Sequence, residues 1–184
     1  VPIIERTMDD ETIRMARGGA VSRCGAYELV RELNRGGTGS VWEARHTTLG
    51  RRVAVKVLHA EYATHQELVA RLEREGQAAA RVKHPNVAQI LDVGHDGHRL
   101  WLIMEVLEGE DLEALLQREA PLSPARALDL MLPVLAAIVA AHKVGVVHRD
   151  LKPGNIFLAR DGNGATVPKV VDFGFSKIHV EEGE

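Results

Sequence analysis

The chain lacks the features by which several classes of protein are recognised. It has a single cysteine, Cys24, so no disulfide can form within the chain and no metal site can be built on several thiolates. The formal net charge is −3 at pH 7, which argues against a nucleic-acid binder held by an excess of basic charge. We therefore expect a reducing compartment, the cytoplasm, and no nucleic-acid partner.

Long apolar runs are also missing. A membrane-spanning helix needs roughly 18 to 20 apolar residues in a row, and the longest candidate, 131–141, is interrupted by Pro133 and is typical of a buried helix. The beginning of the chain carries acids and lacks the charged-then-apolar pattern of a secretory signal. We expect no membrane segment in this stretch, and any membrane anchor would lie beyond Glu184.

What the chain does have is enough apolar sequence for a packed core, 45% of 184 residues, the length of one ordinary domain. Residues 1–25 show no sustained periodicity, and we expect a flexible leader there. Alternating or β-branched segments predict five strands, at 27–33, 41–45, 52–58, 87–93 and 99–106.

Helical periodicity predicts a helix over 66–82, a short one over 111–118, and a third that begins at Ser123-Pro124. In the third helix, the spacing of apolar residues predicts that one stripe is buried: Leu128, Leu132, Leu135, Val139 and His142. Pro133 should kink this helix or cost it one hydrogen bond.

The richest pattern lies near the end of the chain. Residues 148–155 read His-Arg-Asp-Leu-Lys-Pro-Gly-Asn, and Asp172-Phe173-Gly174 follows after one more strand-like stretch. Transfer of a phosphoryl group needs a carboxylate to orient the attacking hydroxyl, a cation for the moving phosphate and oxygen ligands for magnesium. This segment supplies all three.

These motifs resemble the catalytic loop and the metal-binding motif of protein kinases, and the resemblance extends over 27–177. It implies that Asp150 positions a substrate hydroxyl, that Lys152 neutralises the γ-phosphate, and that Asn155 and Asp172 hold Mg²⁺. Lysine two residues after the aspartate is typical of kinases that act on Ser and Thr. His148 and Phe173 are interpreted as packing residues, and Arg149 would pair with a phosphorylated or acidic segment.

Two motifs upstream fit the same resemblance. Residues 34–41 resemble the glycine-rich loop over the phosphates, with Asn34, Gly36, Gly37 and Gly39 as nucleotide-binding positions; Asn34 stands where the family has glycine. Val53-Ala54-Val55-Lys56 resembles the strand whose lysine contacts the α- and β-phosphates. A lysine in an apolar strand needs a partner, and the resemblance assigns Glu75 of the 66–82 helix; Glu73, the rival, faces away.

The adenine site is implied by the resemblance alone. Residues 104–109 occupy the place of the hinge, so backbone groups of Glu105 and Leu107 would bind the adenine edge and Met104 would guard the back of the pocket. Asp111 stands where ribose is often bound. The ring would lie between the side chains of Val41, Ala54 and Phe157.

The expected fold is therefore α+β: a protein-kinase-like two-lobe fold with a five-stranded antiparallel N-lobe sheet and one helix over 26–107, and a partial, mainly helical C-lobe over 108–184. The chain resembles bacterial Ser/Thr kinases of eukaryotic type and should be cut short before the activation segment is complete. We expect the piece alone to lack peptide kinase activity and to self-associate through exposed apolar surface.

The expected activity is ATP- and Mg²⁺-dependent phosphorylation of a protein Ser or Thr hydroxyl. A pseudokinase-like scaffold that binds nucleotide without catalysis is one alternative, although Lys56, Glu75, Asp150, Asn155 and Asp172 are all present. A small-molecule phosphotransferase is another, and the substrate phosphorylated would separate the two. Seven histidines, His59 and His95 among them, show no ligand-like pairing and are interpreted as surface or packing residues.

Overall fold

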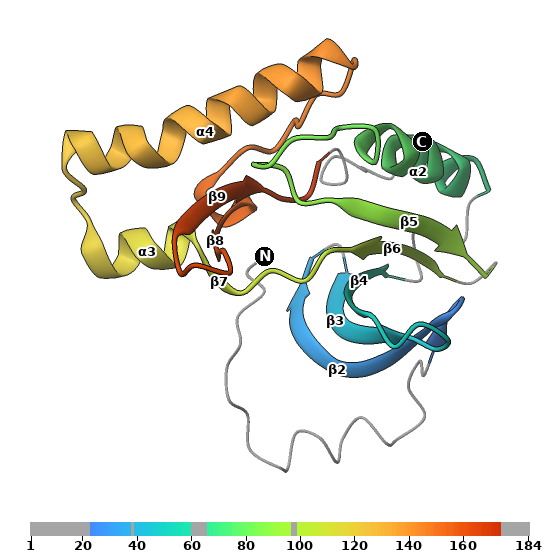
Figure 1. Cartoon of the computed structure of the whole chain (residues 1–184). Coiled ribbons are helices and arrows are strands. Elements are labelled where there is room, and N and C mark those ends of the chain that lie inside the picture. The colour runs from blue at the N-terminus through green and yellow to red at the C-terminus, as the bar shows by residue number, and fades with distance from the viewer. Residues whose placement is uncertain (1–22, 38, 60–65, 97–98, 174–184) are drawn as a thin grey trace.

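The structure is a computed structural model, and it describes residues 23–37, 39–59, 66–96 and 99–173. Two lobes are joined by the segment between β6 and β7 (Figure 1). The N-lobe holds a six-stranded antiparallel sheet in the order β1-β2-β3-β4-β6-β5, with helix α2 lying along β5. The C-lobe holds helices α3 and α4 and a three-stranded antiparallel sheet in the order β7-β8-β9.

The elements of the N-lobe follow the expected pattern with small changes of boundary. They are β1 (Arg23–Cys24), β2 (Tyr27–Gly36), β3 (Gly39–His46), β4 (Arg52–Leu58), α2 (Gln66–Ala79), β5 (Ile90–His95) and β6 (Leu100–Met104). The sixth strand, β1, comes from residues expected in the leader and pairs with Glu28 and Tyr27 of β2. The predicted five strands are all present, and β2 and β3 extend further into the glycine-rich turn.

Strand β4 is the centre of this sheet because it pairs with β3 on one side and β6 on the other. Its two faces contact different clusters. Val53, Val55 and Val57 pack with Trp101 on the outer face, whereas Ala54 packs with Val41 and Phe157 towards the C-lobe. This alternation follows from the two-residue period of a strand, and it places Lys56 on the same face as Ala54.

The C-lobe elements are β7 (Gly109–Asp111), α3 (Leu112–Glu119), α4 (Pro124–Lys143), the 3₁₀ turn η2 (Pro153–Asn155), β8 (Ile156–Arg160) and β9 (Thr166–Val170). Ser123 caps α4 as predicted, because its hydroxyl accepts a hydrogen bond from the backbone N–H of Arg126 at 3.3 Å. Asp111 caps α3 in the same way through the N–H of Ala114 at 2.6 Å.

The prediction of the buried face of α4 is wrong. Its leucines and valine are about half exposed: Leu128 56%, Leu132 58%, Leu135 53% and Val139 53%; His142 is exposed as well. The buried residues are Leu130, Val134, Ala137 and Ala141. The helix is apolar around most of its circumference, so periodicity could not select a face; small alanines allow the close approach that packing on the C-lobe core requires.

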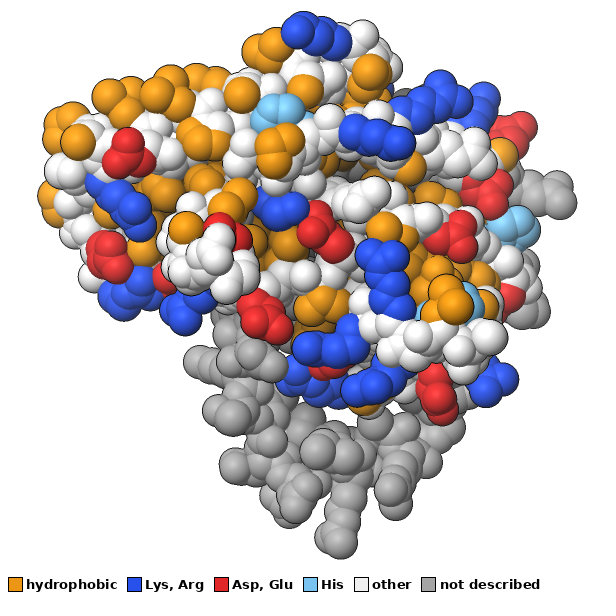
Figure 2. All heavy atoms as spheres, viewed as in Figure 1, with side chains coloured by type: hydrophobic (Ala, Val, Ile, Leu, Met, Phe, Trp, Pro, Cys, Tyr) orange, Lys and Arg blue, Asp and Glu red, His pale blue; other side chains and the backbone are white. Residues whose placement is uncertain are grey.

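Figure 2 shows hydrophobic side chains gathered along α4. Among the described residues α4 is the one helix long and apolar enough to cross a membrane by length and composition, a test that core helices of soluble proteins also pass.

Candidate active site

The catalytic loop is organised around the carboxylate of Asp150. Lys152 Nζ lies 3.0 Å from Asp150 Oδ2, and the side-chain amide of Asn155 donates to the same oxygen at 3.1 Å and to the Asp150 carbonyl at 2.8 Å. The η2 turn folds Asn155 back onto Asp150, as expected for a Pro-Gly pair at this position. The hydrogen bond from Lys152 is the main reason that the pKa of Asp150 lies below its usual value.

The strand that leads to Asp172 is fastened to this loop at Val171. The Val171 N–H donates to the carbonyl of Asn155 at 3.0 Å, and the Val171 carbonyl accepts from His148 Nε2 at 2.8 Å. His148 Nδ1 accepts from the Asp150 N–H at 3.3 Å, so the neutral ring makes both of its hydrogen bonds. Burial lowers the pKa of His148, and the Val171 bond only partly offsets this.

His148 also packs on Phe173, with ring centroids 4.8 Å apart, and both residues are buried. This agrees with the interpretation of the two as packing residues. Arg149 and Asp172 have positive φ, 65° and 61°. Such backbone is uncommon for residues other than glycine and concentrates at functional sites.

Lys56 pairs with Asp172 rather than with Glu75. Its Nζ lies 2.8 Å from Asp172 Oδ2, and the two side chains are 4% and 14% exposed. Burial alone would raise the pKa of Asp172, but the Lys56 ammonium outweighs burial and holds that pKa below its usual value. The predicted Lys56–Glu75 ion pair is therefore absent from this structure, because Asp172 occupies the lysine.

Glu75 is bound by arginines instead. Its Oε1 lies 3.1 Å from an Nη atom of Arg149 and 3.5 Å from Nε of Arg71. Its Oε2 is buried and has no hydrogen-bond partner in the described part of the chain. Glu73, the rival for Lys56, lies 3.4 Å from His95 Nε2 on β5.

The side chains expected around adenine come together in one place. A single buried cluster contains Val41, Ala54, Met104, Leu107 and Phe157. They come from β3, β4, β6, the segment after β6, and β8, so the fold brings together residues far apart in the sequence. The shared cluster is what an adenine site between two lobes requires, although the same contacts also make ordinary core.

The hinge segment is anchored from behind. The backbone of Glu105 donates to the Gln89 carbonyl at 3.0 Å, while Glu105 Oε1 accepts from Gln89 N–H and Lys169 Nζ, each at 2.8 Å. No backbone hydrogen bond is found for Leu107 among the described residues, which leaves its N–H and carbonyl available to a ligand.

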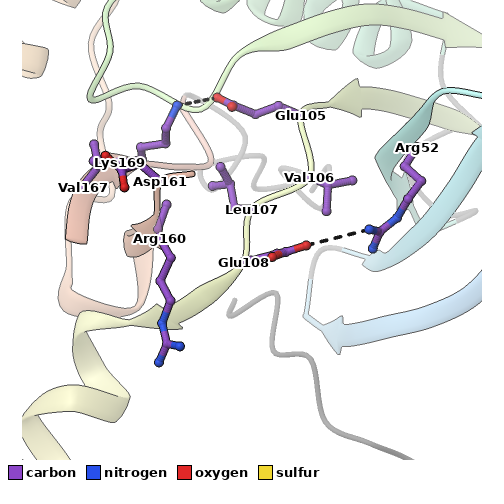
Figure 3. Close-up of a pocket in the computed structure, with 10 residues that line it drawn as sticks. Arg52, Glu105, Val106, Leu107, Glu108, Arg160, Asp161, Val167 and Lys169 are labelled. Carbon is purple, nitrogen blue, oxygen red and sulfur yellow. Dashed lines mark hydrogen bonds and ion pairs between the residues drawn. The ribbon is translucent and has the colours of Figure 1, made fainter. Parts of the chain in front are cut away.

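Beside the hinge lies a hollow of about 320 Å³. Figure 3 shows Lys169 and Glu105 joined above it and Arg52 and Glu108 joined at its other side. Of the residues that line this hollow, only Glu105 and Leu107 belong to the predicted nucleotide set. The hollow therefore adjoins the cluster that would hold adenine, with which it shares Leu107 and Ala159.

The remaining predicted positions lie in the glycine-rich turn and at the start of α3. Asn34 and Gly36 end β2, Gly39 begins β3, and Gly37 lies between them in the turn. A Cβ atom at Gly39 would collide with the Val57 carbonyl, so glycine is required there. Asp111, the predicted ribose ligand, is buried, and its Oδ1 is used to cap α3.

The predicted metal ligands are an amide oxygen and a carboxylate, the hard oxygen donors that Mg²⁺ prefers. Asn155 uses its Nδ2 within the catalytic loop, and among the described contacts its Oδ1 accepts no hydrogen bond. Asp172 Oδ2 is taken by Lys56. The pair therefore fits Mg²⁺ if the ion takes the place of the Lys56 ammonium.

Sequence reasoning missed Lys169, which binds Glu105 from β9. The signal was present: Lys169 interrupts an apolar strand at 166–170 just as Lys56 interrupts 52–58. It also missed Glu43, whose carboxylate is nearly buried between Arg31 Nε at 2.7 Å and Arg52 Nε at 2.8 Å. The sequence of one strand does not indicate which residue of the neighbouring strand will form an ion pair with it.

Comparison with known proteins identifies the protein family to which this fold and site belong. Residues 27–184 match the model of the protein kinase domain, and the chain belongs to that family. Within the family, the relatives named below are bacterial Ser/Thr kinases, as the sequence predicted. It is 44% identical to the serine/threonine-protein kinase Pkn1 of Myxococcus xanthus over 156 residues, which cover 85% of this chain and 22% of Pkn1.

Identity to the serine/threonine-protein kinase PknA of Mycobacterium tuberculosis is 40% over 162 residues, covering 85% of this chain and 37% of PknA. Among solved structures, the kinase domain of PknI from Mycobacterium tuberculosis matches with a TM-score of 0.74 at 29% identity, covering 86% of this chain and 64% of that one. The chain thus spans less than half of the length of Pkn1 and of PknA. The likeness to the PknI kinase domain confirms the protein-kinase-like fold that the sequence predicted.

Proposed function

We propose that the protein transfers the γ-phosphoryl group of ATP to a Ser or Thr hydroxyl of a protein. The observation that carries this is the arrangement around Asp150, where Lys152 and Asn155 contact one carboxylate oxygen. Asp150 is ionised at neutral pH, because its pKa lies below an ordinary value that is already acidic, so the carboxylate can accept a hydrogen bond from an incoming hydroxyl and orient it. The relatives named as Ser/Thr kinases support the same activity.

In the reaction, the hydroxyl oxygen forms a bond to the γ-phosphorus while the bond from that phosphorus to the β–γ bridging oxygen breaks, and ADP leaves. The proton of the hydroxyl passes to Asp150, and Lys152 compensates charge on the moving group. Mg²⁺ would be held by Asn155 and Asp172 and would neutralise charge on the phosphates. The cluster of Val41, Ala54 and Phe157 would enclose the adenine.

Binding of MgATP would rearrange the ion pairs. With Mg²⁺ on Asp172, Lys56 would turn to the phosphates and to Glu75, whose buried Oε2 is unsatisfied among the described groups. A buried acceptor without a partner costs roughly 1–3 kcal/mol. That cost favours a second arrangement in which Lys56 reaches Glu75.

The test is a phosphorylation assay with MgATP, a mixture of protein substrates and a small hydroxylated compound, comparing the full-length protein with its Asp150→Asn variant. Phosphate on protein Ser or Thr that the variant does not transfer supports the proposal. Phosphate only on the small compound would favour a small-molecule phosphotransferase. MgATP binding without transfer by either protein would favour a nucleotide-binding scaffold.

Two further proposals concern partners and place. A reducing cytoplasm fits the free, buried Cys24 thiol, whose pKa burial raises to about 11.

The exposed stripe of α4, formed by Leu128, Leu132, Leu135 and Val139, is a surface through which 1–184 would self-associate. Light scattering of 1–184 beside its Leu132→Lys variant tests this, and two equally monodisperse monomers would contradict it.

A further inference from the structure

One contact to the glycine-rich turn comes from outside the motifs. His59 directly follows β4, the strand that carries Lys56, and its Nε2 lies 3.0 Å from the carbonyl oxygen of Gly36. The two residues are 23 positions apart in the sequence, and the imidazole is half-buried. A carbonyl oxygen only accepts hydrogen bonds, so Nε2 must carry the hydrogen and donate it.

The two sides of the turn are held by different means. On the β3 side, Gly39 pairs with Leu58 in the strand ladder and lies so close to β4 that a Cβ atom would meet the Val57 carbonyl. On the β2 side, Gly36 pairs with Gly39, and His59 adds a bond from β4 to its carbonyl. Beyond this point, Gly37 has open space where a Cβ would be. The Gly36–Gly39 pair and the His59 bond are thus the last described attachments before the apex.

Because the peptide unit is planar, the contact between His59 and the Gly36 carbonyl also fixes the direction of the Gly37 N–H. The Gly36 carbonyl and the Gly37 N–H belong to one planar trans peptide unit, so they point in opposite directions. In β4, Val55 and Val57 belong to the outer cluster and Ala54 belongs to the cluster towards the C-lobe. By the two-residue period of a strand, Lys56 shares the face of Ala54, and we infer that His59, one residue past the end of β4, lies on the side of Val55 and Val57. A carbonyl drawn towards His59 therefore turns the Gly37 N–H towards the Lys56 side.

We propose that His59 is a positioning residue for phosphate binding: its Nε2–H holds the Gly36 carbonyl and thereby aims the Gly37 N–H at the nucleotide phosphates. The inference rests on the proposed nucleotide site and adds a residue to it. Backbone N–H groups in glycine-rich turns bind phosphate when they converge on it. Fixing one of them before the ligand arrives removes an ordering cost from binding.

The experiment measures binding of MgATP and of adenosine to the full-length protein by calorimetry. His59→Phe keeps a ring but has no donor; we expect its MgATP affinity to fall about three- to ten-fold, the loss of roughly one hydrogen bond, with adenosine affinity unchanged. His59→Gln has a side-chain N–H and should recover most of the MgATP affinity. His95→Phe, a histidine on β5 far from the turn in sequence, is the control and should bind both as the unmutated protein does.

A second readout follows the proposed group itself. MgATP should shift the Gly37 amide resonance in the unmutated protein and shift it less in His59→Phe. Equal MgATP affinities for His59→Phe and the unmutated protein would overturn the inference, as would an equal loss of MgATP and adenosine binding. If the unmutated protein binds neither ligand, the proposed nucleotide site itself fails and the role of His59 fails with it.

Discussion

Two lysine–aspartate pairs lie in the candidate active site, and their burial differs far more than their N–O distances. Lys56 and Asp172 are 2.8 Å apart with side chains 4% and 14% exposed, whereas Lys152 and Asp150 are 3.0 Å apart and 57% and 31% exposed. The first pair joins the two lobes, and the second lies within one loop. Distance alone would make them equivalent.

Burial separates their roles. Removing one partner of a buried pair leaves a charge in a medium that solvates it poorly, whereas an exposed ion loses little because water replaces its partner. The buried pair should therefore hold the lobes together before the nucleotide binds. The exposed pair can open at low cost when a substrate hydroxyl and a phosphate arrive, which suits the catalytic role proposed for Asp150 and Lys152.

The largest expected effect is that of Asp172→Ala on stability. It leaves the Lys56 ammonium buried without its partner, and we expect the free energy of unfolding to fall by about 3–5 kcal/mol. Asp150→Ala, the matched change in the exposed pair, should cost about 1 kcal/mol or less. Urea denaturation of the two variants measures both values, and equal losses would remove the distinction between the pairs.

The second effect concerns Glu75, which would receive Lys56 when MgATP displaces it. Glu75→Gln keeps the shape of the side chain but removes its charge, so we expect kcat/KM for ATP to fall roughly tenfold or more, at least about 1.4 kcal/mol. Because Arg149 and Arg71 are about half exposed, stability should change by less than about 1 kcal/mol. An unchanged kcat/KM would mean that Lys56 never transfers to Glu75.

The third prediction concerns how the free energy of unfolding depends on pH through the protonation of His148. The folded protein binds a proton at His148 less readily than the unfolded chain, because burial lowers that pKa from 6.5. Unfolding then takes up a proton, so stability should fall as the pH falls below 6.5. His148→Gln should flatten this slope. A slope that persists in the variant would assign it to another group.

The carboxylates of Asp150 and Asp172 affect stability in a lower pH range than His148 does. The pKa values of Asp150 and Asp172 both lie below 3.8 in the folded protein, so their contributions are present above pH 3.8 and are lost as the pH falls through the folded values. The loss should be larger for Asp172, the buried member of the comparison. Melting curves between pH 7 and 3 for Asp150→Asn and Asp172→Asn would show which acid carries the low-pH loss.

How far the sequence could predict this site depends on the range of each contact. Asp150, Lys152 and Asn155 lie within one turn, so their motif alone implied that they act together, and the structure places them in contact. Lys56 and Asp172 come from different lobes. Whether Glu75 or Asp172 contacts Lys56 depends on how the two lobes and α2 are placed relative to one another. The sequence motifs place both acids near the nucleotide and do not decide which of them binds the lysine.

The fold shows the same limit. Strand β4 was predictable because one lysine in a run of valines allows few alternatives. The face of α4 was not, since apolar residues occupy more than one side of it, and only the C-lobe core selects Val134 and Ala137 over Leu132 and Leu135. Sequence periodicity finds an amphipathic face where polar residues define the other side, and α4 has no polar residue between Leu130 and Ala141.

The smallest stability effect should be that of Lys152→Ala, and it sharpens the comparison most. Lys152 is more than half exposed, so its loss should change the free energy of unfolding by less than about 1 kcal/mol. Its proposed work is in the transition state, where the γ-phosphoryl group carries the charge that it compensates. We therefore expect kcat to fall by on the order of a hundredfold while stability stays near that of the unmutated protein. Phosphorylation assays and urea denaturation of the same sample test both parts, and a kcat loss no larger than the stability change explains would make Lys152 a surface residue rather than a catalytic one.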